Sequence, residues 1–200
     1  MDTFSKRTAW VRDAIGGRPA VRFDGVDDYL ATAGSQGLDF SGGFTAFFLL
    51  KRINYNNTGG PFTCRADGKA RTQQTLEFYE GAGGGSWTLA ANRSPGSIGF
   101  WSAAGFDTTT APALMSVRMD EALAFSDGPV RRNGGAFTVA ETSVARAPED
   151  TVDIIEMGGG YNGAKLNANI YTVVFYVGRA MTLAEQQAAD ASIIARFGVS

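Results

Sequence analysis

The apolar residues of this 200-residue chain follow a helical period first, a two-residue period for most of the length, and a helical period again at the end. The first segment, 3–15, carries one apolar stripe: Phe4, Thr8, Val11 and Ile15. This spacing predicts a short N-terminal helix that ends at Gly16 and Gly17. The helix either packs on the edge of the domain or serves as a docking arm for another subunit, with Phe4, Val11 and Ile15 as the contact residues.

From Val21 onward, apolar and polar residues alternate in short runs that are separated by turn signals such as Asp67-Gly68 and Asp127-Gly128. The run 43–51 is apolar on both faces, which is typical of a covered central strand. Turn signals recur about every 8–12 residues without alternating strand and helix patterns, and this spacing is typical of an all-β sandwich.

The last predicted strand, 170–177, is followed by a helix. Strict alternation places Ile170 and Val174 on one face of the strand, and it places a second set on the other: Tyr171, Val173, Phe175 and Val177. Both faces therefore need cover, one from the core between the sheets and the other from a terminal helix or a partner subunit. Thr182 and Glu185 form a capping box before an alanine-rich segment that ends at Gly198, so we predict a helix over 183–196.

The amino-acid composition argues against several kinds of functional site. The chain has no histidine, a single cysteine (Cys64) and a net charge of −2. Imidazole catalysis, an intrachain disulfide, cysteine-cluster metal sites and a general phosphate-binding surface are therefore not expected. The longest apolar run, 46–50, is too short to cross a membrane. The N-terminus lacks the apolar stretch of a secretory signal, so we expect work in the cytoplasm or exit by another route.

Two strings at opposite ends of the chain carry a family resemblance. FDGVDDYL at 23–30, followed by FTAFFLLKR at 44–52, resembles the opening of the laminin-G-like family of concanavalin-A-type lectin and glucanase domains. GGG at 158–160, with the strand and helix after it, is similar to that family's ending. The resemblance implies an all-β jelly-roll sandwich of two antiparallel sheets. We therefore place this domain at 18–200, after the helical arm 1–17 that the apolar spacing predicts. In the middle, AFSDG at 124–128 departs from the family's usual turn.

Three kinds of functional site are conceivable on such a jelly-roll sandwich. A glycan-binding face needs exposed aromatic rings beside amides, and the candidates are Tyr55, Trp87, Trp101, Tyr161 and Asn162. The two tryptophans equally suit the core, so the tyrosines are the better surface candidates.

Calcium is the second kind, because the resemblance implies an ion in many members of the family and Ca²⁺ prefers oxygen ligands. Asp24, Asp27 and Asp28 are the candidate ligands, unless Asp24 and Asp27 only hydrogen-bond their own turn. The third kind, a glycosidase carboxylate pair, is not expected, because the E-x-D-x-x-E signature is absent and Glu77 and Glu80 would point to opposite faces.

The sequence thus favours a non-enzymatic structural or adhesion protein of a phage-like particle, as a capsid decoration, head fibre or tail component assembled in the host cytoplasm. Its expected partners are other virion proteins, further copies of itself in the particle and host polysaccharide, with no nucleic acid and no membrane insertion. The alternative is a carbohydrate-binding module of a bacterial surface or secreted system, which would place it outside the cell or on its surface. A glycoside hydrolase is the third hypothesis.

Overall fold

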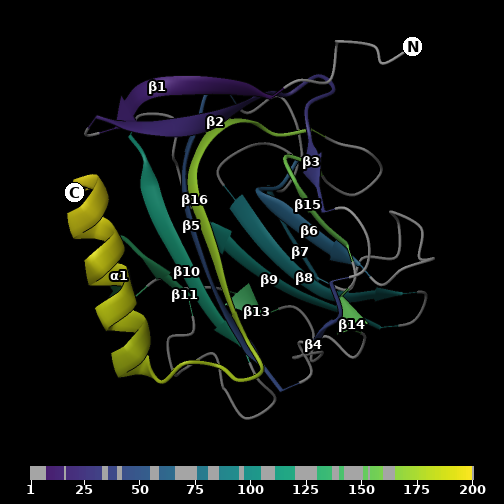
Figure 1. The fold of residues 1–200 in the computed structure, drawn as a ribbon. Helices are drawn as coiled ribbons and strands as arrows, with labels where there is room; N and C mark the ends of the chain where they lie inside the picture. Colours follow the sequence, from purple (N-terminus) through teal and green to yellow (C-terminus); the bar gives the residue numbers. More distant parts are fainter. Residues whose placement is uncertain are drawn as a thin grey trace.

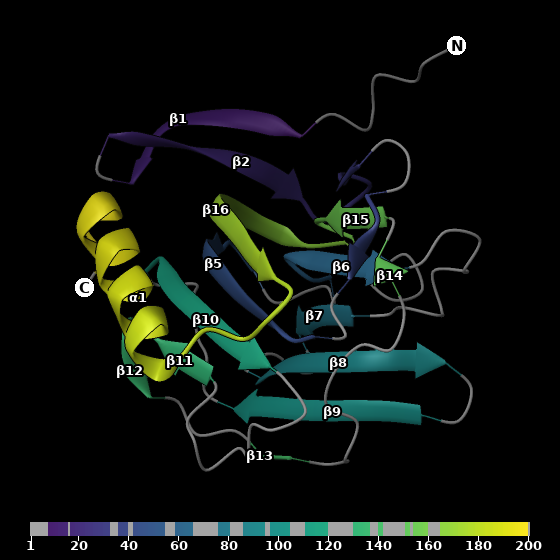
Figure 2. The same ribbon diagram turned by 60° about the horizontal axis from the view of Figure 1, so that its bottom comes forward.

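Two antiparallel β-sheets face each other across one main apolar core, and a C-terminal helix lies on the outside of the first sheet (Figures 1 and 2). This computed structural model describes residues 8–15, 17–32, 36–39, 42–54, 59–65, 76–80, 86–94, 97–104, 111–119, 130–136, 140–141, 151–152, 154–159 and 165–199.

The strand order departs from the chain order in both large sheets. The first sheet runs β1 (Ala9–Ile15), β2 (Arg18–Asp24), β16 (Asn167–Val177), β5 (Phe44–Arg52), β10 (Ala113–Met119), β11 (Val130–Arg132) and β12 (Gly135–Ala136). The second runs β13 (Ala140–Glu141), β9 (Ser97–Ala104), β8 (Ser86–Ser94), β7 (Leu76–Glu80), β6 (Phe62–Arg65), β15 (Ile154–Met157) and β3 (Leu30–Ala31). A short ribbon pairs β14 (Thr151–Val152) with β4 (Leu38–Asp39). Distant segments of the chain are therefore neighbours, as in a jelly-roll sandwich.

The core between the sheets is built around phenylalanine rings from both layers. Phe48 of β5 stacks on Phe62 of β6 with ring centroids 4.6 Å apart, and Phe175 of β16 meets Phe62 edge-on at 4.9 Å. Such aromatic pairs add to the stabilisation that comes from burying their surface. Residues 44–50 of β5 are all buried, as predicted for a covered central strand.

A β-bulge in β16 changes which side chains face the core. Ile170 is opposite Leu50 of β5, while Thr172 is opposite Leu49, so Tyr171 is an extra residue in the ladder. The alternation predicted from the sequence is therefore wrong at this point. Ile170 faces the core together with the later residues Val173, Phe175 and Val177, whereas Tyr171 packs on the helix side.

The helix α1 (Leu183–Phe197) confirms the prediction within one residue, including the capping box. The Glu185 N–H donates to Thr182 Oγ1 (3.2 Å), and the Thr182 N–H donates to Glu185 Oε2 (2.7 Å). The helix covers the outer face of β5 and β10 over an apolar cluster of Phe47, Leu49, Leu114 and Val199. It does not cover all of that face, since Val174 and Tyr176 of β16 stay exposed. Among the described residues α1 is the one helix, and it is not long and apolar enough to span a bilayer.

Buried polar contacts fix the middle of α1 to the sheet. Gln186 Nε2 donates to Ser116 Oγ (3.0 Å), and Arg131 Nε donates to Asp190 Oδ2 (2.9 Å). Burial raises the pKa of the Asp190 carboxyl, while hydrogen bonds with Ser116 and Arg131 act in the opposite direction. These contacts set the position of the helix along the sheet.

The predicted N-terminal helix is wrong over the described residues, because 9–15 form the edge strand β1. β1 pairs antiparallel with β2, with Trp10 opposite Val21 and Val11 opposite Ala20. The chain then turns at Gly17, which has a left-handed φ of 73°. The ladder with β2 satisfies the backbone groups of β1, and this tertiary contact overrides the weak helical spacing. The predicted boundary at residue 17 consequently falls inside a hairpin.

Candidate functional site: a hollow beside the end of the C-terminal helix

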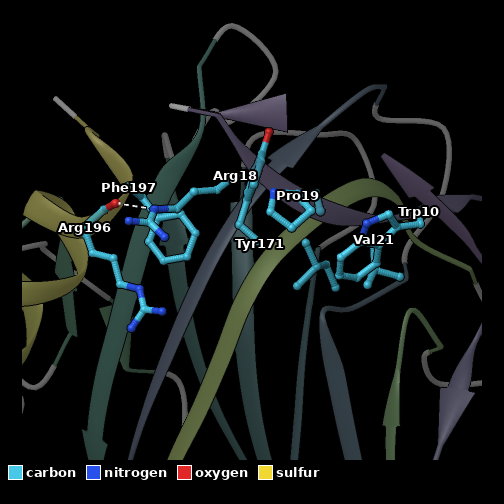
Figure 3. A pocket seen from close by; sticks show the side chains of 9 residues that line it. Trp10, Arg18, Pro19, Val21, Tyr171, Arg196 and Phe197 are labelled. Atoms are coloured by element: carbon cyan, nitrogen blue, oxygen red, sulfur yellow. Dashed lines mark hydrogen bonds between the residues drawn. The ribbon is translucent and has the colours of Figure 1, made fainter. Parts of the chain in front are cut away.

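A hollow of about 200 Å³ lies where the β1–β2 hairpin, β16 and the C-terminal end of α1 meet (Figure 3). It forms at the position where β2 stops pairing with β16, because that ladder ends at Ile170 and the bulge follows at Tyr171. Nine residues line it: Trp10, Arg18, Pro19, Ala20, Val21, Ile170, Tyr171, Arg196 and Phe197.

Three aromatic side chains are spaced along the hollow. Phe197 lies at the helix end, Tyr171 in the middle and Trp10 at the far end (Figure 3). Trp10 has 66% of its surface exposed, an unusual state for a tryptophan. Aromatic rings held at such a surface offer flat apolar faces to a ligand, while tyrosine and tryptophan add a polar group.

Arg18 is held in place from two directions. Its Nε donates to the carbonyl oxygen of Arg196 at 2.6 Å, and its guanidinium carbon lies 5.5 Å from the centroid of the Phe197 ring. The carbonyl belongs to the last turn of α1, where a cation is favoured by the helix dipole. Within the described part of the chain, the Nη1 and Nη2 groups of Arg18 donate no hydrogen bond.

The polar groups of the hollow suit hydrogen bonding at neutral pH. Burial raises the pKa of the Tyr171 phenol, and a hydrogen bond with Asn169 lowers it by less. The hydroxyl therefore stays protonated at neutral pH and is able both to donate and to accept. No aspartate or glutamate belongs to the nine lining residues, whereas two arginines do.

A second, apolar hollow of about 190 Å³ adjoins the first and shares Val21, Ile170 and Tyr171 with it. Its remaining lining residues are Phe23, Met157, Thr172 and Val173. No charged residue of the described part of the chain lines this second hollow, whereas Arg18 and Arg196 line the first.

The predicted glycan-binding residues are not brought to this hollow. Trp87 lies on β8 opposite Ala103, and Trp101 lies on β9 opposite Leu89, so both belong to the second sheet. The other predicted residues lie outside the described part of the chain: Tyr55, Tyr161 and Asn162.

Of the predicted docking residues, Phe4 lies outside the described part of the chain. Val11 is half-buried in β1, and Ile15 packs against the apolar cluster under α1 of its own chain. Docking of another subunit on these residues stays a prediction.

The predicted calcium ligands do come together. One carboxylate oxygen from each of Asp24, Asp27 and Asp28 lies within 4.8 Å of the others. Two of these carboxylates also stabilise the turn, because the Val26 N–H donates to Asp24 Oδ1 (2.8 Å) and the Asp24 N–H donates to Asp28 Oδ2 (3.0 Å). Burial, together with the neighbouring negative charges, raises the pKa of Asp28. Calcium binding here stays a prediction.

Two glutamates share the outer face of the second sheet without forming an open carboxylate pair. Glu77 and Glu156 are 0% and 3% exposed, and each is opposite Thr63 on the intervening strand β6. Arg65 Nη2 donates to Glu156 Oε1 at 3.0 Å. Because both side chains are buried, neither offers a carboxylate to a sugar ring in solution.

Comparison with known proteins gives independent support for the fold. No protein-family model and no curated protein matches the sequence. Solved structures do match. The CBM40 of the Ruminococcus gnavus IT-sialidase bound to alpha2,3 sialyllactose is 12% identical, with a TM-score of 0.58 over 81% of this chain and 96% of that one. Domain 4 of AbnA, a GH43 extracellular arabinanase from Geobacillus stearothermophilus, in complex with arabinotriose, is 16% identical, with a TM-score of 0.61 over 95% and 84%.

A third match is the native heptameric SAP-like pentraxin from Limulus polyphemus, 13% identical, with a TM-score of 0.56 over 86% of this chain and 81% of that one. Identities this low carry information on the fold alone. The chain has the jelly-roll β-sandwich fold of these structures, as the sequence resemblance implied.

Proposed function

We propose that this protein is a non-catalytic carbohydrate-binding module, and that its glycan site is the hollow between the β1–β2 hairpin and the end of α1. The observation that carries the proposal is the convergence of Trp10, Tyr171 and Phe197 with the Arg18 guanidinium in one surface hollow. Sugars present apolar C–H faces and a fringe of hydroxyl groups. A site that combines aromatic surface with a few directed polar groups matches both features.

The known ligands of two similar structures agree with this class of function, since one holds sialyllactose and another holds arabinotriose. The hollow, at about 200 Å³, is smaller than the roughly 300–1,000 Å³ of sites that enclose a drug-sized ligand. It therefore suits one terminal sugar residue, with the rest of the glycan outside. Trp10, at the open end, provides the stacking surface.

Binding is favoured over hydrolysis because the two glutamates that share a face of the second sheet, Glu77 and Glu156, are buried. A glycan-binding module would act outside the cell or on its surface, and we propose this location for the protein. The expected place in a phage-like particle gains no support from the similar structures, so the proposal concerns glycan binding only.

The experiment is a glycan-array screen of the full chain, followed by titration calorimetry with each glycan that binds. Trp10→Ala removes the exposed ring, and we expect Kd to rise about tenfold, which corresponds to about 1.4 kcal/mol. Val26→Ala is the matched control, because Val26 is 76% exposed but lies outside the hollow, and its Kd should equal that of the wild type.

Two outcomes would count against the proposal. If the folded wild-type chain binds no glycan on the array, the proposed function is overturned. Wild-type affinity in Trp10→Ala would show that the glycan site lies elsewhere.

A further inference from the structure

We infer that the hollow selects glycans whose terminal sugar carries a carboxylate, and that Arg18 is the residue that binds this group. The inference rests on the proposed function and narrows it to a substrate class. It is carried by the placement of Arg18, whose guanidinium is fixed on one edge and open on the other inside an aromatic-lined hollow.

The geometry leaves the ligand-binding end of the guanidinium available. Arginine has five N–H donors, and the Arg196 carbonyl oxygen accepts only from Nε. The Nη1 and Nη2 groups together form the edge that binds a carboxylate with two parallel hydrogen bonds. Because Phe197 and the helix end already hold the guanidinium, little side-chain freedom is left to lose when a ligand binds.

The charge of Arg18 is not balanced inside the hollow. The nine lining residues include no carboxylate, and the second charged residue among them, Arg196, is also cationic. Arg22 lies four residues further along β2, but it donates from Nη2 to Asn167 Oδ1, and it does not line the hollow. An anionic sugar would supply the missing negative charge, whereas a neutral sugar would leave the guanidinium with only water.

A carboxylate suits this environment better than a phosphate. Its two oxygens and single charge match the planar guanidinium edge. The hollow also lies at the C-terminal end of α1, where the helix dipole carries partial negative charge. A doubly charged phosphate would meet more repulsion from that helix end than a singly charged carboxylate does.

The test compares three methyl glycosides by titration calorimetry or ligand-detected NMR on the full chain: glucuronic acid, its methyl ester and glucose 6-phosphate. A sialic acid glycoside with its methyl ester provides a second acid–ester pair. We expect each acid to bind about tenfold more tightly than its ester, and added salt to weaken the acid but not the ester. Arg18→Gln should lower the affinity for the acid to that for the ester while leaving the affinity for the ester unchanged.

Two variants separate ligand binding from structure. Arg179→Gln is the matched control, since Arg179 also stacks on an aromatic ring beside an end of α1, yet it does not line the hollow. Its preference for the acid should equal that of the wild type. Arg18→Lys keeps the charge at the helix end without the two-pronged edge, and it should show an intermediate preference for the acid even if Arg18→Gln unfolds.

The outcomes distinguish the two proposals. Equal binding of acid and ester, weakened about tenfold by Trp10→Ala, would overturn the carboxylate inference but leave glycan binding in place. Binding of the phosphate as tight as that of the acid would overturn the preference for a carboxylate. If the screen in the preceding section yields no glycan, the proposed function fails, and the inference fails with it.

Discussion

The two ends of α1 use similar parts for different purposes. At the N-terminal end, the Arg179 guanidinium lies 5.1 Å from the centroid of the Tyr176 ring. At the C-terminal end, the Arg18 guanidinium lies 5.5 Å from that of Phe197. Both arginines come from outside the helix, and both stack on an aromatic ring beside one of its ends.

The difference lies in the remaining donors of each arginine. Arg179 makes two hydrogen bonds with Glu185, from Nη1 to Oε2 (2.9 Å) and from Nη2 to Oε1 (2.8 Å), and the same glutamate completes the capping box. The Nη groups of Arg18 have no comparable carboxylate among the residues that line the hollow. The donors of Arg179 are therefore used within the structure, while the Nη groups of Arg18 are left for the proposed ligand.

The largest expected effect concerns the middle of α1. The comparison of the two helix ends assumes that buried contacts in the middle attach the helix to the sheet. Asp190→Ala leaves the Arg131 guanidinium buried without its carboxylate, and we expect a loss of about 3–5 kcal/mol in the free energy of unfolding. Chemical denaturation measures this loss. Gln187→Ala, at an exposed position of the same helix, should change stability by less than about 0.5 kcal/mol. A loss below about 1 kcal/mol for Asp190→Ala would show that the buried pair does not hold the helix.

A pair of cap variants tests the two ends directly. Thr182→Ala removes the N-cap hydroxyl, and Gly198→Ala places a Cβ on a residue with φ of 65°. Each should cost about 1 kcal/mol, the first through the lost cap and the second through left-handed backbone strain, since a Cβ at Gly198 meets no atom within 4 Å. Thr182→Ala should leave the Kd for a bound glycan unchanged, while Gly198→Ala, next to Phe197, should raise it. The reverse pattern would contradict the assignment of the hollow.

The smallest expected effect is a pH dependence confined to the N-terminal end. The Arg179 guanidinium and the Thr182 N–H hold the pKa of Glu185 at about 2, below its ordinary value of 4.5. The folded state thus favours the carboxylate, so this stabilisation is complete above the ordinary value and is lost as the pH falls from about 4.5 through 2. Thermal melting of Glu185→Gln should show a weaker loss of Tm than the wild type over that interval. Parallel curves for the two proteins would mean that the pair contributes nothing measurable.

The elements at the two ends of the chain differ in how well local pattern predicts them. The capping box at Thr182 and Glu185 and the terminal Gly198 define α1 from adjacent residues alone, and the structure confirms them. For 9–15, the apolar spacing fits a helix, but the residues form a strand because β2 lies beside them. β2 follows β1 directly after the turn, but their pairing leaves no mark in the helical spacing of the apolar residues.

The candidate site was less accessible to prediction than the fold. The sequence predicts a glycan site on aromatic residues in or near loops. The hollow is instead lined by Trp10 of an edge strand and Arg18 beside a hairpin turn. The acidic cluster at Asp24, Asp27 and Asp28 was found because its members lie within five residues of one another. The hollow joins residues more than 150 positions apart, and no motif encodes that distance.

The sequence by itself determined the all-β sandwich, the buried central strand and the terminal helix with its caps, because these follow from short-range alternation and local hydrogen bonds. Only the tertiary structure decided that the N-terminal segment is a strand, that a bulge turns Tyr171 outward, and that Arg18 meets Phe197. The first depends on pairing with the neighbouring strand β2, and the other two depend on ladder register and packing between segments far apart in the sequence. A shift of one residue in such a ladder moves a side chain to the opposite face.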